Sequence, residues 1–356
     1  MNPARILSAC GVLAYLALAG CSGDASDDLG TTDDALLLMN AGKPMPCADP
    51  APISTANDEK TWFVYCTGMN HVWKTSDWTS FSDAASSLVF HFGSLNALGR
   101  NTNTWWAPSI LYLPSKKTYA LWVSVEDGNQ ASDDRRSLAV FSGPSPTGPW
   151  TFERYGKRAA ANGEHHIDPG LVTGSGGAHW LYWKSYGGTA QSAINGAALG
   201  GDALAIAGEP VKLFDGYDMN GWEQHVRENP SVWENPQTGV WHMLYSGAAW
   251  ADSTYATGHA FSTCGALCRS AGGWRIASAE DRGVAQVMQA KNDATFAHGG
   301  PGGAAWLGSS GNWIVFAAAA RSKQGDKTRY LFRQHLTWGA NHSPYVNTAK
   351  HIPSGF

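Results

Sequence analysis

The chain has 356 residues and a formal net charge of −4, and 15% of its residues are charged against 43% hydrophobic. Its Lys and Arg residues form no basic cluster, which argues against nucleic acid or an acidic lipid surface as the main partner. A neutral ligand suits this composition better. The 17 Trp and 12 Tyr residues supply flat faces with polar edges on which sugar rings stack, although we expect most of them in the core.

The first 20 residues are typical of a signal peptide. Arg5 precedes an uncharged, mostly apolar run over residues 6–20, which is too short for a stable membrane span. The run ends in Leu18-Ala19-Gly20-Cys21, which resembles the lipobox of bacterial lipoproteins, where the Cys receives lipid. We therefore expect Cys21 to anchor the mature chain at the cell envelope or outside the cell. A plain secretory signal is the alternative.

The next segment differs sharply in composition from the rest of the chain. Residues 22–34 hold five Asp and no Lys or Arg, so residues 21–41 are predicted to form a solvated acidic tether. Residues 42–356 are rich in Trp, Tyr and Gly and are long enough for a large core. We expect them to form one domain that acts as a monomer.

Four cysteines remain for this domain, and a secreted chain encounters oxidising conditions. Two local disulfides fit best, Cys47 with Cys66 and Cys264 with Cys268. A zinc site is the alternative, but the chain has no Cys-x-x-Cys pair with a matching His spacing.

A repeat built on proline organises the domain. Its markers are Asp49-Pro50, Ala107-Pro108, Asp168-Pro169, Asn229-Pro230 and Gly300-Pro301. The intervals are 58, 61, 61 and 71 residues, and a strand-like apolar run follows each marker after a turn-forming cluster. Five units of short strands predict an all-β chain folded as a five-bladed β-propeller. A β-sandwich, or two in tandem, is the competing architecture.

The inner strand of each propeller blade lines a central channel, so equivalent positions of different units meet there. Around the repeat marker, three units place an acid: Asp49, Asp168 and Glu228. Each acid alone has an ordinary structural explanation, as a turn residue or an ion-pair partner. Together, however, three acids in one narrow channel repel one another unless they are used.

Cleavage of a glycosidic bond needs one carboxylic acid to protonate the leaving oxygen and one carboxylate to attack or to activate water. A third carboxylate, together with partial burial, keeps the acid protonated near neutral pH. Three converging acids meet that requirement.

These motifs resemble those of glycoside hydrolase family 43, a group of five-bladed propellers that cleave arabinan and xylan with inversion. The resemblance rests on Ala48-Asp49-Pro50, Trp106-Ala107-Pro108-Ser109-Ile110, Ile167-Asp168-Pro169, Glu228-Asn229-Pro230-Ser231-Val232 and Ala297-His298-Gly299-Gly300. It covers nearly all of the mature chain. Ser109, Asn229 and Ala297 depart from the usual pattern, which puts substrate fit in doubt more than chemistry.

The resemblance implies a role for each acid. Asp49 would be the general base that activates water, Glu228 the general acid, and Asp168 the residue that orients Glu228 and tunes its pKa. Inversion then predicts that the carboxyl groups of Asp49 and Glu228 stand roughly 6.5–9.5 Å apart, which leaves room for the water.

Four further residues are candidates for substrate binding. Trp105 and Trp106 are predicted to form a sugar-stacking wall, with one of them packing between blades, and Arg329 is predicted to reach a sugar hydroxyl. His298 resembles the channel His of the family, which in some members holds a calcium ion or a water molecule. A hydrogen-bonded His without metal is an equal alternative, so no cofactor is expected to be required.

The sequence therefore predicts a glycoside hydrolase acting on plant arabinan, arabinoxylan or xylo-oligosaccharides. The first alternative is a carbohydrate-binding propeller without catalysis, which would have no need of three acids. The second is a retaining fructan hydrolase, which is disfavoured because no Asp-Pro-Asn or Arg-Asp-Pro signature occurs.

Overall fold

The computed structural model describes residues 36–40, 43–55, 59–69, 71–85, 88–128, 135–188, 190–215, 221–251, 253–268, 273–276, 286–289, 300–319, 328–338 and 344–345. The chain divides into two units, residues 1–31 and 32–356, and all described residues lie in the second. The signal peptide, Cys21 and most of the tether therefore lie outside the described residues. Within the described ranges, no helix is long and apolar enough to cross a membrane.

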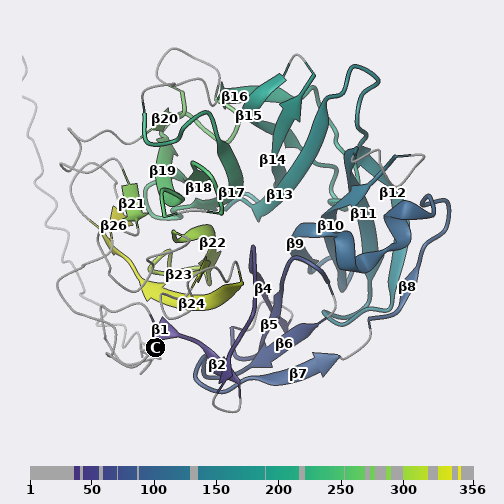
Figure 1. Ribbon diagram of the computed structural model, residues 1–356, viewed down its shortest axis with the longest axis horizontal. Coiled ribbons are helices and arrows are strands. Elements are labelled where there is room, and N and C mark those ends of the chain that lie inside the picture. The colour runs from purple at the N-terminus through teal and green to yellow at the C-terminus, as the bar shows by residue number, and fades with distance from the viewer. Residues whose placement is uncertain are drawn as a thin grey trace, which may run out of the picture. The chain divides into compact units, whose positions relative to one another are not determined.

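Five sheets surround one axis, with strands β4, β9, β13, β17 and β22 nearest the centre (Figure 1). The first sheet contains β4 (Ala51–Ser54), β5 (Trp62–Tyr65), β6 (Val72–Thr75) and β7 (Ser82–Ala85). The second contains β9 (Trp106–Leu113), β10 (Thr118–Glu126), β11 (Arg136–Gly143) and β12 (Trp150–Lys157), with β8 (Phe90–His91) parallel to β12. The third contains β13 (His165–Thr173), β14 (His179–Gly187), β15 (Ala190–Ala198) and β16 (Val211–Asp215).

The fourth sheet contains β17 (Arg227–Glu234), β18 (Trp241–Gly247), β19 (Ala256–Ser262) and β20 (Arg275–Ile276), and β21 (Gln286–Gln289) also pairs with β19. The fifth contains β22 (Gly302–Leu307), β23 (Trp313–Ala319), β24 (Arg329–His335) and β1 (Leu36–Leu37). Small pairs join β2 (Met39–Asn40) to β3 (Lys43–Pro44) and β25 (Thr337–Trp338) to β26 (Pro344–Tyr345). Two 3-10 turns, η2 (Leu98–Arg100) and η3 (Thr102–Thr104), precede β9. The predicted all-β, five-bladed propeller is confirmed.

The burial of the strands explains why the chain forms a propeller. In β10 the seven central residues are all buried, and every residue of β18 is buried. A strand covered on both faces shows a continuous apolar run, without alternation. Trp122 of the second sheet and Trp183 of the third belong to one apolar cluster, because neighbouring sheets pack face to face around the ring.

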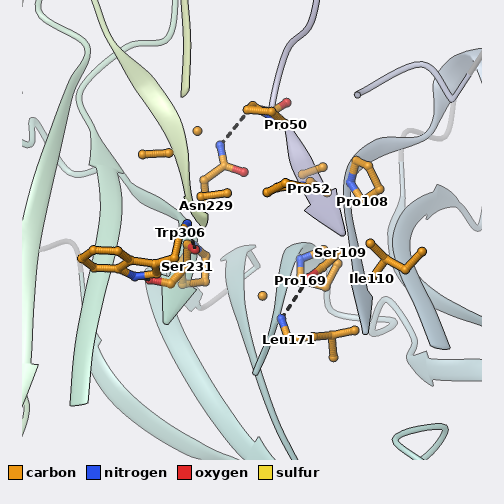
Figure 2. Close-up of a pocket in the computed structure, with 18 of the residues that line it drawn as sticks. Pro50, Pro52, Pro108, Ser109, Ile110, Pro169, Leu171, Asn229, Ser231 and Trp306 are labelled. Atoms are coloured by element: carbon orange, nitrogen blue, oxygen red, sulfur yellow. Dashed lines mark hydrogen bonds between the residues drawn. The ribbon is translucent and has the colours of Figure 1, made fainter. Parts of the chain in front are cut away.

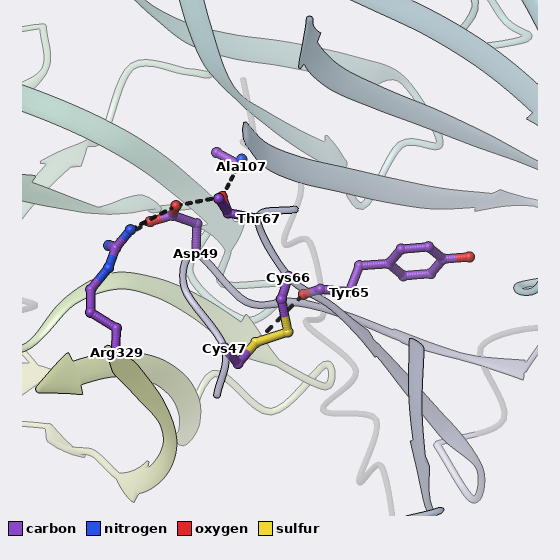
Figure 3. Close-up of a disulfide and its surroundings, with 7 residues drawn as sticks. All are labelled: Cys47, Asp49, Tyr65, Cys66, Thr67, Ala107 and Arg329. Atoms are coloured by element: carbon purple, nitrogen blue, oxygen red, sulfur yellow. Dashed lines mark hydrogen bonds and ion pairs between the residues drawn. A yellow bond between two sulfur atoms is a disulfide. The ribbon is translucent and has the colours of Figure 1, made fainter. Parts of the chain in front are cut away.

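The N-terminal segment closes the ring. Strand β1 pairs with β24, with Leu36 opposite Arg333, and the backbone N–H of Cys47 donates to the carbonyl oxygen of Arg329 at 2.9 Å. The Cys47–Cys66 disulfide then links this segment to the end of β5 in the first sheet (Figure 3). The propeller therefore includes residues 36–40, which the sequence analysis assigned to the tether.

Both predicted disulfides are confirmed. Cys47 bonds Cys66 and Cys264 bonds Cys268. The zinc alternative is wrong, because all four sulfur atoms are used in these two bonds.

One residue in or just before each inner strand has positive φ at the central channel. These residues are Asp49 (50°), Ala107 (41°), Asp168 (57°), Asn229 (51°) and Gly303 (60°). The strand register shifts at the same points in the second to fifth sheets. Residues of all five inner segments line one central cavity of about 120 Å³ (Figure 2). The repeat therefore brings distant segments to one axis.

The structure corrects the phase of the repeat in the fifth sheet. The sequence placed Gly300-Pro301 at the marker position, whereas the bulge lies at Gly303. Glycine adopts positive φ freely, so this strand reaches the shared conformation without a following proline. In the fourth sheet the marker residue is Asn229, and Glu228 lies one residue before it.

Candidate active site

A cavity of about 380 Å³ contains all three predicted acids. It is lined by Asp49, Thr67, Trp106, Ile167, Asp168, Lys184, Tyr186, Glu228, Asn229, Trp250 and Arg329. These residues come from all five sheets or from segments adjoining them, as the repeat predicted for the acids. Convergence of the three carboxyl groups depends on the ring and on no single local motif.

Asp49 is held by donors on both of its carboxyl oxygens (Figure 3). Arg329 donates to Oδ1 at 2.9 Å and to Oδ2 at 3.1 Å. Thr67 Oγ1 donates to Oδ2 at 2.7 Å, and Asn229 Nδ2 donates to Oδ1 at 3.1 Å. A carboxyl group that accepts this many hydrogen bonds is fixed in direction.

Glu228 is held from two sides. Lys184 Nζ lies 2.7 Å from Oε2, and the hydroxyl of Tyr255 donates to Oε1 at 2.8 Å. Burial, followed by the charge of Glu228, raises the pKa of Tyr255 well above its usual value, so the hydroxyl keeps its proton. The side chains of Lys184 and Glu228 are 10% and 12% exposed. The ion pair is therefore largely shielded from solvent.

Asp168 is the most buried of the three acids. Burial raises the pKa of Asp168 well above its usual value, the charges of Glu228 and Asp49 add to this, and Lys184 opposes it. Its Oδ2 accepts the backbone N–H of Asn229 at 3.2 Å, and its own N–H donates to Ser124 Oγ at 3.0 Å. Burial thus favours the neutral form of the Asp168 carboxyl group.

The aromatic residues of the cavity differ from the prediction in one respect. Trp106 lines the cavity, with the guanidinium of Arg136 3.6 Å from its ring centroid. Trp105 is fully buried, packs against Phe90 and Phe141, and donates from Nε1 to the carbonyl oxygen of Gly99. The prediction that Trp105 binds substrate is therefore wrong, because adjacent residues of an extended segment face opposite ways.

Arg329 lies in the cavity as predicted, but the charged partner of its side chain is Asp49. His298 lies outside the described residues, so its predicted place in the channel stays a prediction. Among the described residues, no group of three or more His, Cys, Asp or Glu side chains is placed to hold a metal ion. We derive no catalytic step through a metal.

Sequence reasoning missed several residues of the site, among them Lys184, Asn229, Trp250 and Tyr255. Two of them carried a signal. Asn229 occupies the same repeat position as Asp49 and Asp168, and Lys184 interrupts a strand that is otherwise apolar or aromatic at its centre. Trp250 lies on a loop and is 48% exposed, an exposure that the sequence did not indicate.

The comparisons with known proteins agree with this geometry. A family model described as glycosyl hydrolases family 43 matches residues 47–344. The chain belongs to glycosyl hydrolase family 43. It is therefore a glycoside hydrolase, and the resemblance found in the sequence motifs is confirmed. A search of curated proteins by sequence finds no match.

Solved structures of family 43 type share the fold. A thermostable family-43 glycoside hydrolase superposes with a TM-score of 0.62 at 20% identity, covering 86% of this chain and 95% of that one. An α-L-arabinofuranosidase from Lactobacillus brevis gives 0.64 at 16% identity, with 87% and 96% covered. An arabinanase from Bacillus subtilis gives 0.57 at 18% identity, with 84% and 97% covered. At these identities the likeness shows the fold alone.

Proposed function

We propose that this family 43 hydrolase cleaves arabinose- or xylose-containing plant polysaccharides or oligosaccharides with inversion of configuration. The observation that carries the proposal is the meeting of Asp49, Asp168 and Glu228 in one cavity. The names of similar structures support the sugar class, since they include an exo-1,5-α-L-arabinanase and a xylan β-1,4-xylosidase.

The charges of the cavity suit a neutral substrate. Asp49 pairs with Arg329 and Glu228 pairs with Lys184, while burial favours the neutral form of Asp168. Both cations are therefore engaged by protein carboxylates. An uncharged sugar can bind in this cavity without a free charged group to pair with.

In the proposed mechanism, Asp49 takes a proton from a water molecule on one face of the sugar. The water oxygen forms a bond to the anomeric carbon while the bond to the leaving oxygen breaks. Glu228, protonated in the reactive form, gives its proton to that oxygen. Arg329, Thr67 and Asn229 fix the direction of the base's carboxyl group, and the family resemblance gives Asp168 the role of orienting Glu228.

The test is hydrolysis by the purified mature domain of p-nitrophenyl α-L-arabinofuranoside, p-nitrophenyl β-D-xyloside and linear arabinan. Glu228→Gln and Asp49→Asn are the matched controls. We expect activity on at least one substrate and its loss in both variants. The anomeric proton of the first product, followed by NMR, should show inverted configuration. A retained anomer would refute the proposed roles, and equal rates in wild type and variants would refute the proposed site.

We also propose that Cys21 carries a lipid that holds a monomeric enzyme at the cell envelope. The lipobox-like Leu18-Ala19-Gly20-Cys21 supports this. Fractionation of expressing cells tests it, since Cys21→Ser should move the protein from the membrane fraction to the soluble fraction. An unchanged distribution would refute the anchor.

A further inference from the structure

A repeated hydrogen bond joins neighbouring sheets near the channel. In three sheets a hydroxyl on or just after the second strand accepts the N–H of the positive-φ residue of the next sheet. The pairs are Thr67 with Ala107 at 2.8 Å, Ser124 with Asp168 at 3.0 Å, and Ser246 with Gly303 at 2.8 Å. The hydroxyl satisfies a backbone donor that the bulge leaves unpaired.

The third sheet departs from this pattern at Lys184, and the fifth sheet departs from it at Ala317, which has no hydroxyl. Lys184 is paired with Ile167 beside the bulge, as Ser124 is with Trp106 and Ser246 with Glu228. An ammonium group has no acceptor, so it cannot take the N–H of Asn229. That N–H donates to Asp168 Oδ2 at 3.2 Å, and Lys184 Nζ instead lies 2.7 Å from Glu228 Oε2.

The exchange of a hydroxyl for a lysine is costly for folding. Lys184 is 8% exposed, and a buried ion pair commonly stabilises a protein less than apolar or neutral groups of similar volume. Departures from a local structural rule are expected where function requires them. Of the two departures, at Lys184 and at Ala317, only Lys184 places a charged group against the predicted acid.

We propose that Lys184 is a positioning residue for hydrolysis: it directs the carboxyl group of Glu228 and sets the pH range over which that group carries a proton. The proposal rests on the proposed role of Glu228 as general acid. It assigns to a lysine of β14 part of the task that the family resemblance gives to Asp168 alone.

The charged and titratable groups around Glu228 come from five places in the fold. Lys184 on β14 and Tyr255 before β19 contact its oxygens, while Asp168 on β13, Asp49 before β4 and Arg329 on β24 act from farther away. Burial lowers the pKa of Lys184, but the charges of Glu228 and Asp168 outweigh this and raise it overall. Lys184 therefore stays positive, and its Nζ lies 2.7 Å from Glu228 Oε2.

The test compares three substitutions at this position. Lys184→Met removes the charge and keeps the apolar stem, Lys184→Arg keeps the charge, and Lys184→Ser introduces the hydroxyl that Ser124 and Ser246 supply at this position in the second and fourth sheets. Lys74→Met, at an exposed lysine of β6, is the matched control. Each variant is checked by thermal unfolding, and kcat/KM is measured against pH on the p-nitrophenyl glycoside that wild type cleaves best.

We expect the alkaline limb of kcat/KM in Lys184→Met and Lys184→Ser to move upward by about 1 to 3 pH units, because an opposite charge beside a carboxyl group shifts its titration by that amount. We also expect kcat to fall at least about tenfold in both, with a smaller change in KM. Lys184→Arg should keep the alkaline limb of wild type, and Lys74→Met should match wild type throughout. Folded variants with an unmoved limb would overturn the proposal.

A second measurement does not depend on activity. In protein labelled with 13C at the Glu side-chain carboxyl, the Glu228 signal is identified by its loss in Glu228→Gln. Its titration should move to higher pH in whichever of Lys184→Met or Lys184→Ser is folded. An unchanged titration overturns the role of Lys184 even if wild type cleaves none of the glycosides. Absence of cleavage by wild type would count against the proposed function and not against the contact between Lys184 and Glu228.

Discussion

Substitutions of Asn229 can distinguish the hydrogen bond of its side-chain amide from the positive φ that its position requires. Nδ2 donates to Asp49 Oδ1 at 3.1 Å, while φ is 51°. Asn229→Gly removes the amide and keeps positive φ without strain, whereas Asn229→Ala removes the amide and places a β-carbon at positive φ. The pair of variants therefore isolates each contribution.

The magnitude follows from the contacts of Asp49. A hydrogen bond to a charged acceptor contributes about 1.5–3 kcal/mol. Asp49 keeps the two bonds from Arg329 and the one from Thr67, so we take the lower end of that range. Since about 1.4 kcal/mol is tenfold in rate, kcat/KM should fall about tenfold in both variants. The free energy of unfolding of Asn229→Ala should be about 1 kcal/mol lower than that of Asn229→Gly.

The assay is kcat/KM on the best p-nitrophenyl glycoside, with urea unfolding of the same samples. A wild-type kcat/KM in Asn229→Gly would show that the amide does not support the base. Equal free energies of unfolding for the Gly and Ala variants would refute the argument from the positive φ.

Three further predictions concern the cavity and the disulfides. Trp250→Ala removes the 48% exposed ring at the cavity rim, so KM should rise about 2- to 12-fold with little change in kcat, as loss of an aromatic stacking contact predicts; an unchanged KM would exclude sugar stacking there. Because burial raises the folded-state pKa of Asp168 above its unfolded value near 3.9, ionisation costs stability as pH rises through this range. At pH 7 the free energy of unfolding of Asp168→Asn, measured with urea, should thus exceed that of wild type by at least about 1 kcal/mol. This difference should vanish near pH 4 and below. A difference that persists at low pH would contradict the linkage between ionisation and stability. Loss of the Cys47–Cys66 bond, with its 19-residue separation, should cost about 3 kcal/mol against about 2 kcal/mol for Cys264–Cys268 with a separation of 4, both measured by chemical unfolding of paired Cys→Ala variants; the reverse order would contradict the loop-length argument.

The fold was predictable because its repeat leaves a strong local mark. Four of the five channel positions are followed by proline, and turn clusters separate the strands of each unit. The fifth unit was misplaced for the same reason, since Gly303 takes positive φ without a following proline. The closing strand β1 was missed because two residues that pair with β24, some three hundred positions later, carry no local pattern.

The site was predictable only as far as it follows the repeat. Asp49 and Asp168 occupy the positive-φ position of their units, and Glu228 lies one residue before that position in its own unit. The residues that hold these acids come from second strands, loops and the last sheet, and their contacts exist only after the ring closes. Tyr255, which precedes β19, and Trp250, on the loop after β18, are examples.

The backbone explains which residue types the channel admits. Positive φ disfavours residues with a β-carbon, but Asp and Asn tolerate it better than most, and three of the five positive-φ channel positions hold Asp49, Asp168 and Asn229. The proposed base and tuner therefore stand where the fold already favours short polar side chains and fixes their direction. Glu228 has no such constraint, since it lies on regular strand beside the bulge and has a longer, more flexible side chain. It follows that the proposed acid is the one that depends most on neighbouring side chains, Lys184 and Tyr255, for its position.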